Sequence, residues 1–122
     1  MDNILNDIKK MLGIEPEYDQ FDTDIIIFIN SAITTLKQIG LSTPKNFTIK
    51  TKLETWSEML LDEDDLDNVK PFIYFKTRLG FDPPSNAFVV DAMEREIREL
   101  TFRIQIEADK TDRLNNPLLG GE

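Results

Sequence analysis

The sequence predicts an all-α protein, a small helical bundle of about four to five helices with a long C-terminal helix and a flexible C-terminal tail. Two observations predict this class. Apolar residues recur at the i, i+3, i+4 spacing of a buried helix face in several separate stretches. Glycine and proline stand between these stretches, where helices end. The length of 122 residues suits a single domain. We assign residues 1–110 to the helical domain and 111–122 to the tail.

Two helices are predicted in the first third of the chain. One spans residues 3–12, because Gly13 and then Pro16 end its pattern. The other spans residues 22–39, and Gly40 after it fits the left-handed C′ position of a Schellman motif. Candidates for the N-cap of this second helix are Asp22, Thr23 and Asp24.

The run Ile25–Ile29 is apolar around more than one face of the second helix. Either this helix is buried centrally in the domain's own core, or part of its face meets a neighbouring subunit. The run is far too short to cross a bilayer, which takes about 20 residues. The N-terminus begins acidic and shows no targeting pattern. We therefore expect a protein of a cytoplasm-like compartment that does not enter a membrane.

Residues 42–52 have an irregular composition, although Phe47 and Ile49 alternate with polar neighbours as in a short edge strand. Further on, the acidic run Asp62–Asp65 superficially resembles a calcium loop. The glycine and the terminal glutamate of such a loop are not at their positions. We therefore interpret the run as a solvated acidic connector.

A short amphipathic helix is predicted between these two segments. Thr51 and Glu54 fit a capping box, in which two side chains cap each other's backbone at a helix start. Leu53, Trp56 and Leu60 then share one face. Trp56 is the only tryptophan, and we expect it to be a core anchor at one end of the bundle.

A structural hinge is predicted between two helices that span residues 69–79 and 86–109. The hinge residues are Gly80, Phe81, Asp82, Pro83 and Pro84. The glycine can take the left-handed position that ends a helix, and the phenylalanine can fold back onto the last turn. The two prolines make the link stiff. We expect the two helices to pack against each other, antiparallel or at a steep angle.

The helix over residues 86–109, with Ser85 or Asn86 as its cap, is the longest predicted element. Its apolar stripe consists of Val89, Met93, Ile97, Leu100 and Ile104. On flanking faces lie Phe88, Ala92, Phe102 and Ile106. Acidic and basic residues are also spaced i, i+4, as Asp91–Arg95, Glu94–Arg98 and Glu99–Arg103. Each such pair stabilises a helix by about 0.2–0.5 kcal/mol.

Charge and residue types argue against several classes of function. The net charge of −9 argues against a surface for phosphate backbones. Without cysteine there is no disulfide or thiolate metal site, and without histidine there is no Ser-His or Cys-His nucleophile. No glycine-rich phosphate loop is present. We predict no catalytic residue, no cofactor and no metal site, with a carboxylate-based enzyme as a distant alternative.

Three features in chain order resemble the head–tail connector (head-completion, adaptor) family of tailed bacteriophages. They are Ile29–Ser31 on a helix ending at Gln38–Gly40, then Thr55–Trp56, then Arg78–Pro84 leading into Glu99, Leu100 and Arg103. The likeness covers residues 4–109. It implies a helical structural protein, not an enzyme, that assembles as a ring beneath the portal of the DNA-filled capsid. The ring, dodecameric in the virion, would carry the head-closure (stopper) protein and the tail.

The resemblance also implies a role for the C-terminal tail, which reaches toward the portal protein in related connectors. Leu114, Leu118 and Leu119 are therefore the candidate portal-docking residues. These anchors are too few to order the tail in a free subunit. DNA would pass through an acidic lumen without specific binding, repelled within about 8 Å of the wall.

The implied location is the head–tail interface of the virion, with the host cytoplasm as the place of assembly. The competing class is a small acidic helical regulator, such as a DNA-mimic inhibitor or an antitoxin-like partner. That class needs the same negative charge and the same helices.

Overall fold

The computed structural model describes residues 3–115, with the side chains of residues 3–110. This part of the chain contains helices and no strand. The elements are α1 (Ile4–Met11), α2 (Asp22–Gln38), α3 (Trp56–Met59), the 3₁₀ turn η1 (Glu63–Asp65), α4 (Leu66–Phe81) and α5 (Ala87–Asn115). The predicted all-α class and the long C-terminal helix are confirmed.

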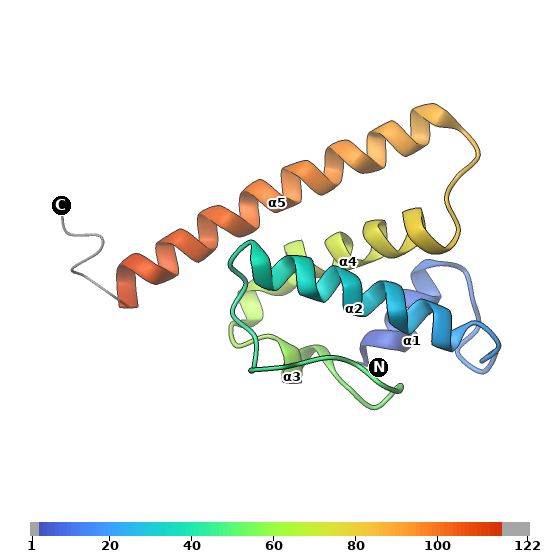
Figure 1. Cartoon of the computed structure of the whole chain (residues 1–122), viewed down its shortest axis with the longest axis horizontal. Coiled ribbons are helices and arrows are strands. Elements are labelled where there is room, and N and C mark those ends of the chain that lie inside the picture. The colour runs from blue at the N-terminus through green and yellow to red at the C-terminus, as the bar shows by residue number, and fades with distance from the viewer. Residues whose placement is uncertain (1–2, 116–122) are drawn as a thin grey trace.

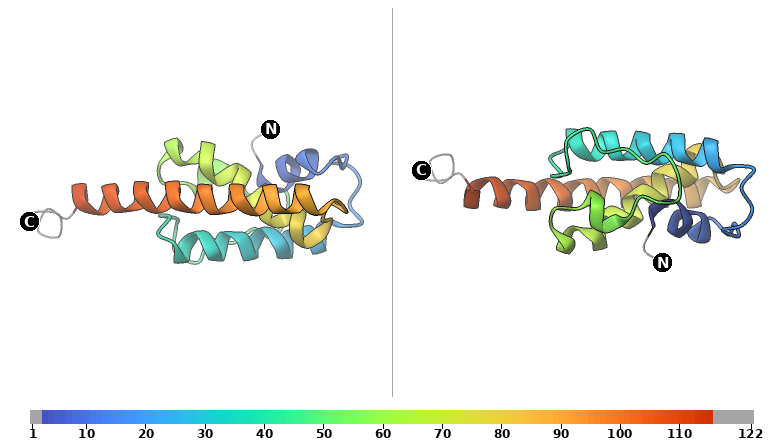
Figure 2. Two further views of the ribbon diagram at one scale, coloured as in Figure 1. Left: turned by 90° about the horizontal axis from the view of Figure 1, so that it is seen from above. Right: turned by 90° about the horizontal axis from the view of Figure 1, so that it is seen from below.

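The helices form two layers (Figure 1). Helices α1 to α4 make a body in which α4 packs mainly against α2. Helix α5 lies over this body, packs against α4, and diverges from it toward the loop that joins them. Both views in Figure 2 show the C-terminal part of α5 running past the other helices. The longest helix is therefore only partly covered by its own chain.

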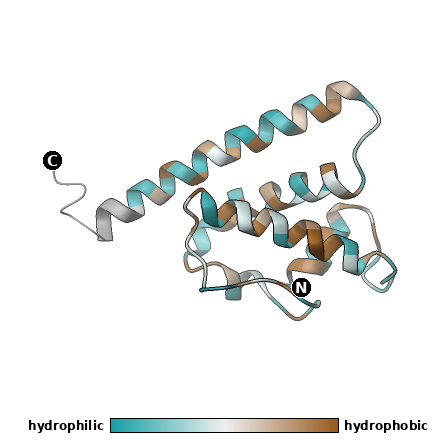
Figure 3. Cartoon of the chain, viewed as in Figure 1, coloured by the Kyte–Doolittle hydropathy of each residue, from teal (hydrophilic) through white to brown (hydrophobic). Residues whose placement is uncertain are grey.

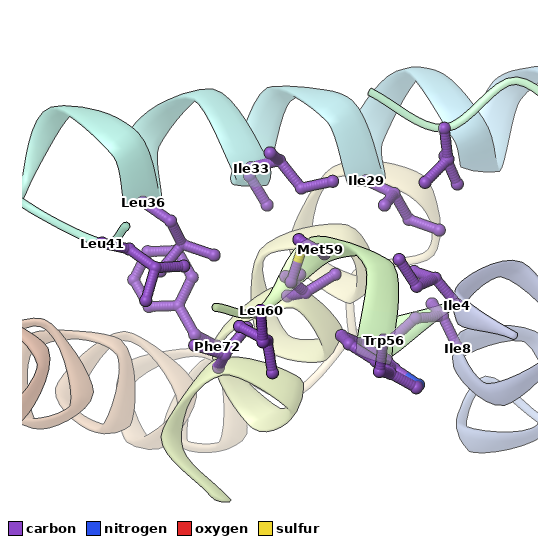
Figure 4. Packing of buried hydrophobic residues seen from close by; sticks show 14 of the residues in the cluster. Ile4, Ile8, Ile29, Ile33, Leu36, Leu41, Trp56, Met59, Leu60 and Phe72 are labelled. Atoms are coloured by element: carbon purple, nitrogen blue, oxygen red, sulfur yellow. The ribbon is translucent and has the colours of Figure 1, made fainter. Parts of the chain in front are cut away.

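The core lies between α1, α2 and α4 and is closed by the segment around α3. Figure 4 shows Trp56 beside Ile4 and Ile8 of α1, and Phe72 of α4 beside Leu36 of α2. Of the described α5 side chains, those of residues 87–110, only Leu100 and Ile104 are buried in this cluster. The run Ile25–Ile29 is divided: Ile25 and Ile29 are buried, whereas Ile27 points to solvent. This helix is therefore a core element of its own domain.

Helices α1 and α2 end as their glycines predict, and after α1 Gly13 has φ +83°. After α2, Gly40 has φ +114°, and the Leu41 N–H donates to the Leu36 carbonyl over 2.9 Å. This is the Schellman bond of the sequence prediction, which is confirmed. A Cβ at Gly40 would also lie 2.8 Å from the Cβ of Ala108 on α5, so the glycine allows α5 to approach the end of α2.

The predicted N-caps of α2 are wrong. The N-cap is Phe21, which makes no side-chain capping bond. Asp22 is drawn away by a stronger partner, because its carboxylate lies 2.7 Å from the buried Lys9 ammonium. An ion pair with a buried ammonium outweighs the modest gain of a cap.

The short helix starts later than predicted. Its capping box is formed by Thr55 and Glu58, not by Thr51 and Glu54. The earlier pair forms only a local turn, and Leu53 beside it is 77% exposed rather than part of the buried face. A capping-box pattern needs a following helix, and residues 51–54 are not helical.

The predicted edge strand at Phe47 and Ile49 is also wrong. The Asn30 side chain of α2 instead makes both hydrogen bonds that a neighbouring strand would supply. It accepts from the Ile49 N–H over 2.8 Å and donates to the Ile49 carbonyl over 2.9 Å. One amide therefore fixes this extended segment to α2 and buries Ile49.

Candidate assembly surfaces

The predicted hinge lies between α4 and α5, but its first two residues belong to α4. Gly80 is helical and does not have the left-handed conformation that the sequence predicted. The helix continues because the Asp82 N–H donates to the Arg78 carbonyl over 2.9 Å, and Asp82 is the C-cap. Pro83 and Pro84 occupy the non-helical link. The link is therefore shorter than predicted.

Asn86 is the residue that starts α5. Its side-chain oxygen accepts from the Phe88 N–H over 2.8 Å. Of the two predicted caps, Ser85 and Asn86, the second therefore makes the capping bond.

Phe81, the last residue of α4, packs against aromatic residues that are distant from it in sequence. Its ring packs edge-on against Phe21, at 5.4 Å between centroids, and Phe21 in turn packs against Tyr18 at 5.6 Å. The predicted role of Phe81 at a C″ position is wrong, because α4 has not yet ended there. The rings instead connect the end of α4 to the loop that precedes α2.

Gly80 is required by packing, not by backbone conformation. A Cβ at this position would lie 2.5 Å from two ring atoms of Phe28 on α2. No ordinary Cβ contact is so short, so the ring or a helix must move. The glycine therefore allows α2 and α4 to approach closely at this point.

Substituting Gly80 with alanine is expected to destabilise the fold. The clash with Phe28 costs about 1–3 kcal/mol, against a gain of about 1 kcal/mol in helix propensity. In the Phe28→Ala background the clash disappears and only the gain should remain. Chemical denaturation of the four proteins of this double-mutant cycle measures both terms. Equal effects of Gly80→Ala in the two backgrounds would contradict the packing role.

A groove of about 670 Å³ lies where α5 diverges from α2 and α4. Its apolar wall includes Phe28, Leu79 and Ile97. Lys76, Glu94 and Arg98 bring charge to its lining. The groove is open and mixed in character, and it contains no arrangement of nucleophile and base.

An acidic cleft lies between η1 and the C-terminal half of α5. Asp62, Asp65 and Glu107 line it, and its volume is about 220 Å³. Partial burial, and then the negative charges of Asp62, Glu107 and Asp64, raise the pKa of the Asp65 carboxyl above its ordinary value. Among residues 3–110, no cluster of acidic side chains has the arrangement of a metal site.

The carboxyl of Glu54 shifts in the opposite direction. Its slight burial acts to raise the pKa, but hydrogen bonds with the backbone of Thr51, Glu54 and Lys50 and with the Thr51 hydroxyl outweigh burial, so the pKa is lowered. This carboxylate stabilises the turn before α3.

Helix α5 presents apolar side chains on the face that points away from the body. Phe88 is 83% exposed and Phe102 is 61% exposed, and Ile106 is also exposed. Val89 was predicted in the buried stripe, but it too is exposed. It lies in the first turn of α5, where the helix is farthest from the body (Figure 1).

The three predicted acid–base pairs along α5 do not form. In the described part of the helix, the side-chain nitrogen and carboxylate oxygen atoms lie more than 4.0 Å apart in all three pairs, Asp91–Arg95, Glu94–Arg98 and Glu99–Arg103. Exposed pairs gain so little free energy that side-chain entropy competes with them. These charges therefore stay available to another molecule.

The family to which this chain belongs is decided by a match over most of its length. The sequence model of a family described as phage connector protein matches residues 4–111. The chain belongs to the phage connector protein family. The head–tail connector resemblance is thereby supported, and this connector is a bacteriophage structural protein. No match was found among curated proteins or among solved structures.

Helix α5 of the connector ends later than predicted. Helix α5 continues from Asp109 to Asn115, because no glycine or proline interrupts it before Pro117. Leu114 is therefore in the helix, although its side chain is outside the described residues. Leu118 and Leu119 lie entirely outside them. None of the helices within residues 3–115 is long and apolar enough to span a membrane.

Sequence reasoning did not recognise the outward face of α5 in this connector. It placed Phe88, Ala92, Phe102 and Ile106 on flanking faces, without asking whether they form a stripe of their own. The signal was present in their spacing, which steps by four and three residues once positions 95 and 99 are included. Figure 3 shows hydrophobic and hydrophilic residues alternating along the coloured part of α5.

Proposed function

We propose that this connector forms a ring beneath the portal of a DNA-filled capsid, joins the portal to the head-closure protein and the tail, and leaves a channel for DNA. Membership of the phage connector family supports a role in joining virion parts. The ring, with twelve copies expected from family resemblance, and its position at the head–tail interface go beyond that membership. The chain would fold in the host cytoplasm and act in the virion.

The observation that carries this proposal is the arm formed by the C-terminal part of α5. The arm projects past the body of the subunit (Figure 2) and leads directly into the leucines of the tail. An arm on a rigid body can reach a neighbouring protein while the body keeps its own contacts. We expect Leu114, Leu118 and Leu119 to dock on the portal protein, where burying a leucine contributes about 1.5–3 kcal/mol.

The charge of the subunit supports a channel that does not retain DNA. The chain has 23 acidic residues against 14 basic ones. An acidic wall repels a phosphate backbone within the Debye length of about 8 Å at physiological salt. We therefore expect no tight or sequence-dependent binding of duplex DNA in 0.15 M salt.

The tail can be tested without disturbing the folded helices. A chain that ends at Asn115 and the double variant Leu118→Ser/Leu119→Ser should both keep the melting temperature of the full chain. Both should bind purified portal at least tenfold more weakly, and electron microscopy should show rings on portals mixed with the full chain but not on portals mixed with either tail variant. Substituting Leu53, an exposed leucine in the segment before α3, with serine is the matched control. Portal attachment that survives both tail changes would refute docking through the tail.

The ring is tested separately from the tail. Electron microscopy of portals with the full chain should show twelve copies around a channel. Portals without any added density would contradict the connector role itself. The competing class, a small acidic regulator, instead predicts a small stoichiometric complex with a basic partner, and family membership favours the connector over it.

A further inference from the structure

The outward face of α5 has the pattern of a coiled-coil seam. We call it the outer stripe, and it consists of Phe88, Ala92, Arg95, Glu99, Phe102 and Ile106. Successive members are four, three, four, three and four residues apart, which is the spacing of heptad positions a and d. The stripe is apolar at both ends and carries one basic and one acidic residue at its centre.

The outer stripe has no partner within the described part of the chain. At 100° per residue it lies opposite the face that packs on the body, where Leu100 and Ile104 are buried. Phe88 and Phe102 are mostly exposed, and Arg95 and Glu99 are exposed as well. Exposed large apolar residues in a line are a feature of association surfaces.

We propose that the outer stripe binds the outer stripe of a second copy of this chain, with the two α5 helices antiparallel. In this register, the residue numbers of each facing pair add up to 194. Phe88 then meets Ile106 of the second copy, and Ala92 meets Phe102. At the centre, Arg95 faces Glu99 twice, once on each side of the two-fold axis. Large residues thus meet small or aliphatic ones, and opposite charges meet.

The charges decide the direction of the pairing. In a parallel pair, a positions face a and d positions face d. Arg95 would then face Arg95 and Glu99 would face Glu99 at the centre of the seam. Like charges in contact are destabilising, and the antiparallel register removes both contacts. Beside the antiparallel seam, Glu96 approaches Glu96 of the second copy, and Arg98 approaches Arg98 of the second copy. Both like-charge pairs lie at the solvent-exposed edges of the seam, where water and salt screen them.

The contact is long enough to be specific. From Phe88 to Ile106 the helix rises about 27 Å at 1.5 Å per residue. A two-fold contact uses the same patch on both copies and closes at two, so it does not itself build a ring. The inference therefore goes beyond the proposed function and describes a dimer of the free chain, in which the exposed phenylalanines are covered.

The test exploits the central charge pair. Sedimentation equilibrium at several concentrations should show a monomer–dimer equilibrium for the full chain. Arg95→Glu places like charges in both central contacts, and so does Glu99→Arg; each should raise the dimer dissociation constant at least tenfold. The double variant Arg95→Glu/Glu99→Arg restores opposite charges and should return it to within about threefold of the wild type. A parallel pair would gain nothing from this exchange.

Apolar variants provide the second measurement. Phe102→Ala should weaken the dimer, whereas Leu53→Ala, which removes an even more exposed apolar side chain elsewhere, should not. Circular dichroism checks that every variant keeps its helices. A free chain that stays monomeric at all concentrations would overturn the inference, and so would charge reversals without effect. Because portal attachment is measured in separate samples, the ring proposal and the dimer can fail independently.

Discussion

Replacing Trp56 with alanine is expected to lower the free energy of unfolding by about 3–5 kcal/mol. The side chain is 3% exposed and closes the core between α1 and the segment around α3 (Figure 4). Its indole N–H donates to Asp7 Oδ2 over 2.8 Å, and the Lys70 ammonium lies 5.5 Å from the ring centroid. Truncation removes the apolar contacts and leaves a cavity, and it also takes away the donor to Asp7.

The Trp56 effect is measured by urea denaturation followed by circular dichroism, because the variant has no tryptophan fluorescence. Trp56→Phe separates the two contributions, since it keeps much of the packing but loses the indole N–H. Asp7 still has Lys70 at 3.2 Å, so this variant should lose only about 1–2 kcal/mol. Leu53→Ala on the surface should stay within about 0.5 kcal/mol of the wild type. A loss below 1 kcal/mol for Trp56→Ala would mean that Trp56 is not an anchor.

The sequence predicts the helices well because helix formation here is mostly local. Gly40 ends α2 by a motif whose hydrogen bonds all lie within six consecutive residues. Gly80 also follows an apolar helical pattern, yet it lies inside α4. A glycine is needed there because it leaves room for the ring of Phe28 on α2. A glycine required by packing and a glycine required by backbone conformation look alike in sequence.

The candidate assembly surfaces were less predictable, for a related reason. Helix α5 is apolar on two opposite faces, and periodicity alone does not tell which of them meets the body. The choice depends on where α4 ends and how far α5 diverges, and Val89 was assigned wrongly for this reason. Local patterns also could not predict the role of Asn30, because its side-chain amide makes hydrogen bonds with the backbone of Ile49, 19 residues further along the chain.

A buried lysine is the feature of the core that was hardest to predict from the sequence. Lys9 lies on α1 next to the apolar Ile8, and its side chain is 0% exposed. Its ammonium lies 2.7 Å from Asp22, and it donates to the carbonyls of Tyr18 over 2.7 Å and Pro16 over 2.9 Å. One side chain therefore joins α1, the loop after it and the first turn of α2.

We expect Lys9→Met to lower the free energy of unfolding by about 3 kcal/mol, at the lower end of the 3–5 kcal/mol typical of breaking a buried ion pair. Methionine fills most of the volume, so the cost comes from three oxygen atoms that lose their donor. Asp22 is 26% exposed and can recover part of its hydration, which places the effect at the lower end.

Lys10→Met removes an equal charge from the exposed neighbouring position, so it separates the buried contact from a change in net charge. It should stay within about 0.5 kcal/mol of the wild type. Lys9→Met combined with Asp22→Leu should recover some stability, because no unpaired carboxylate is then left, but the two carbonyls would still lack a donor. Urea denaturation of the four chains measures these differences. If Lys9→Met and Lys10→Met unfolded at the same urea concentration, the ammonium would not hold these segments together.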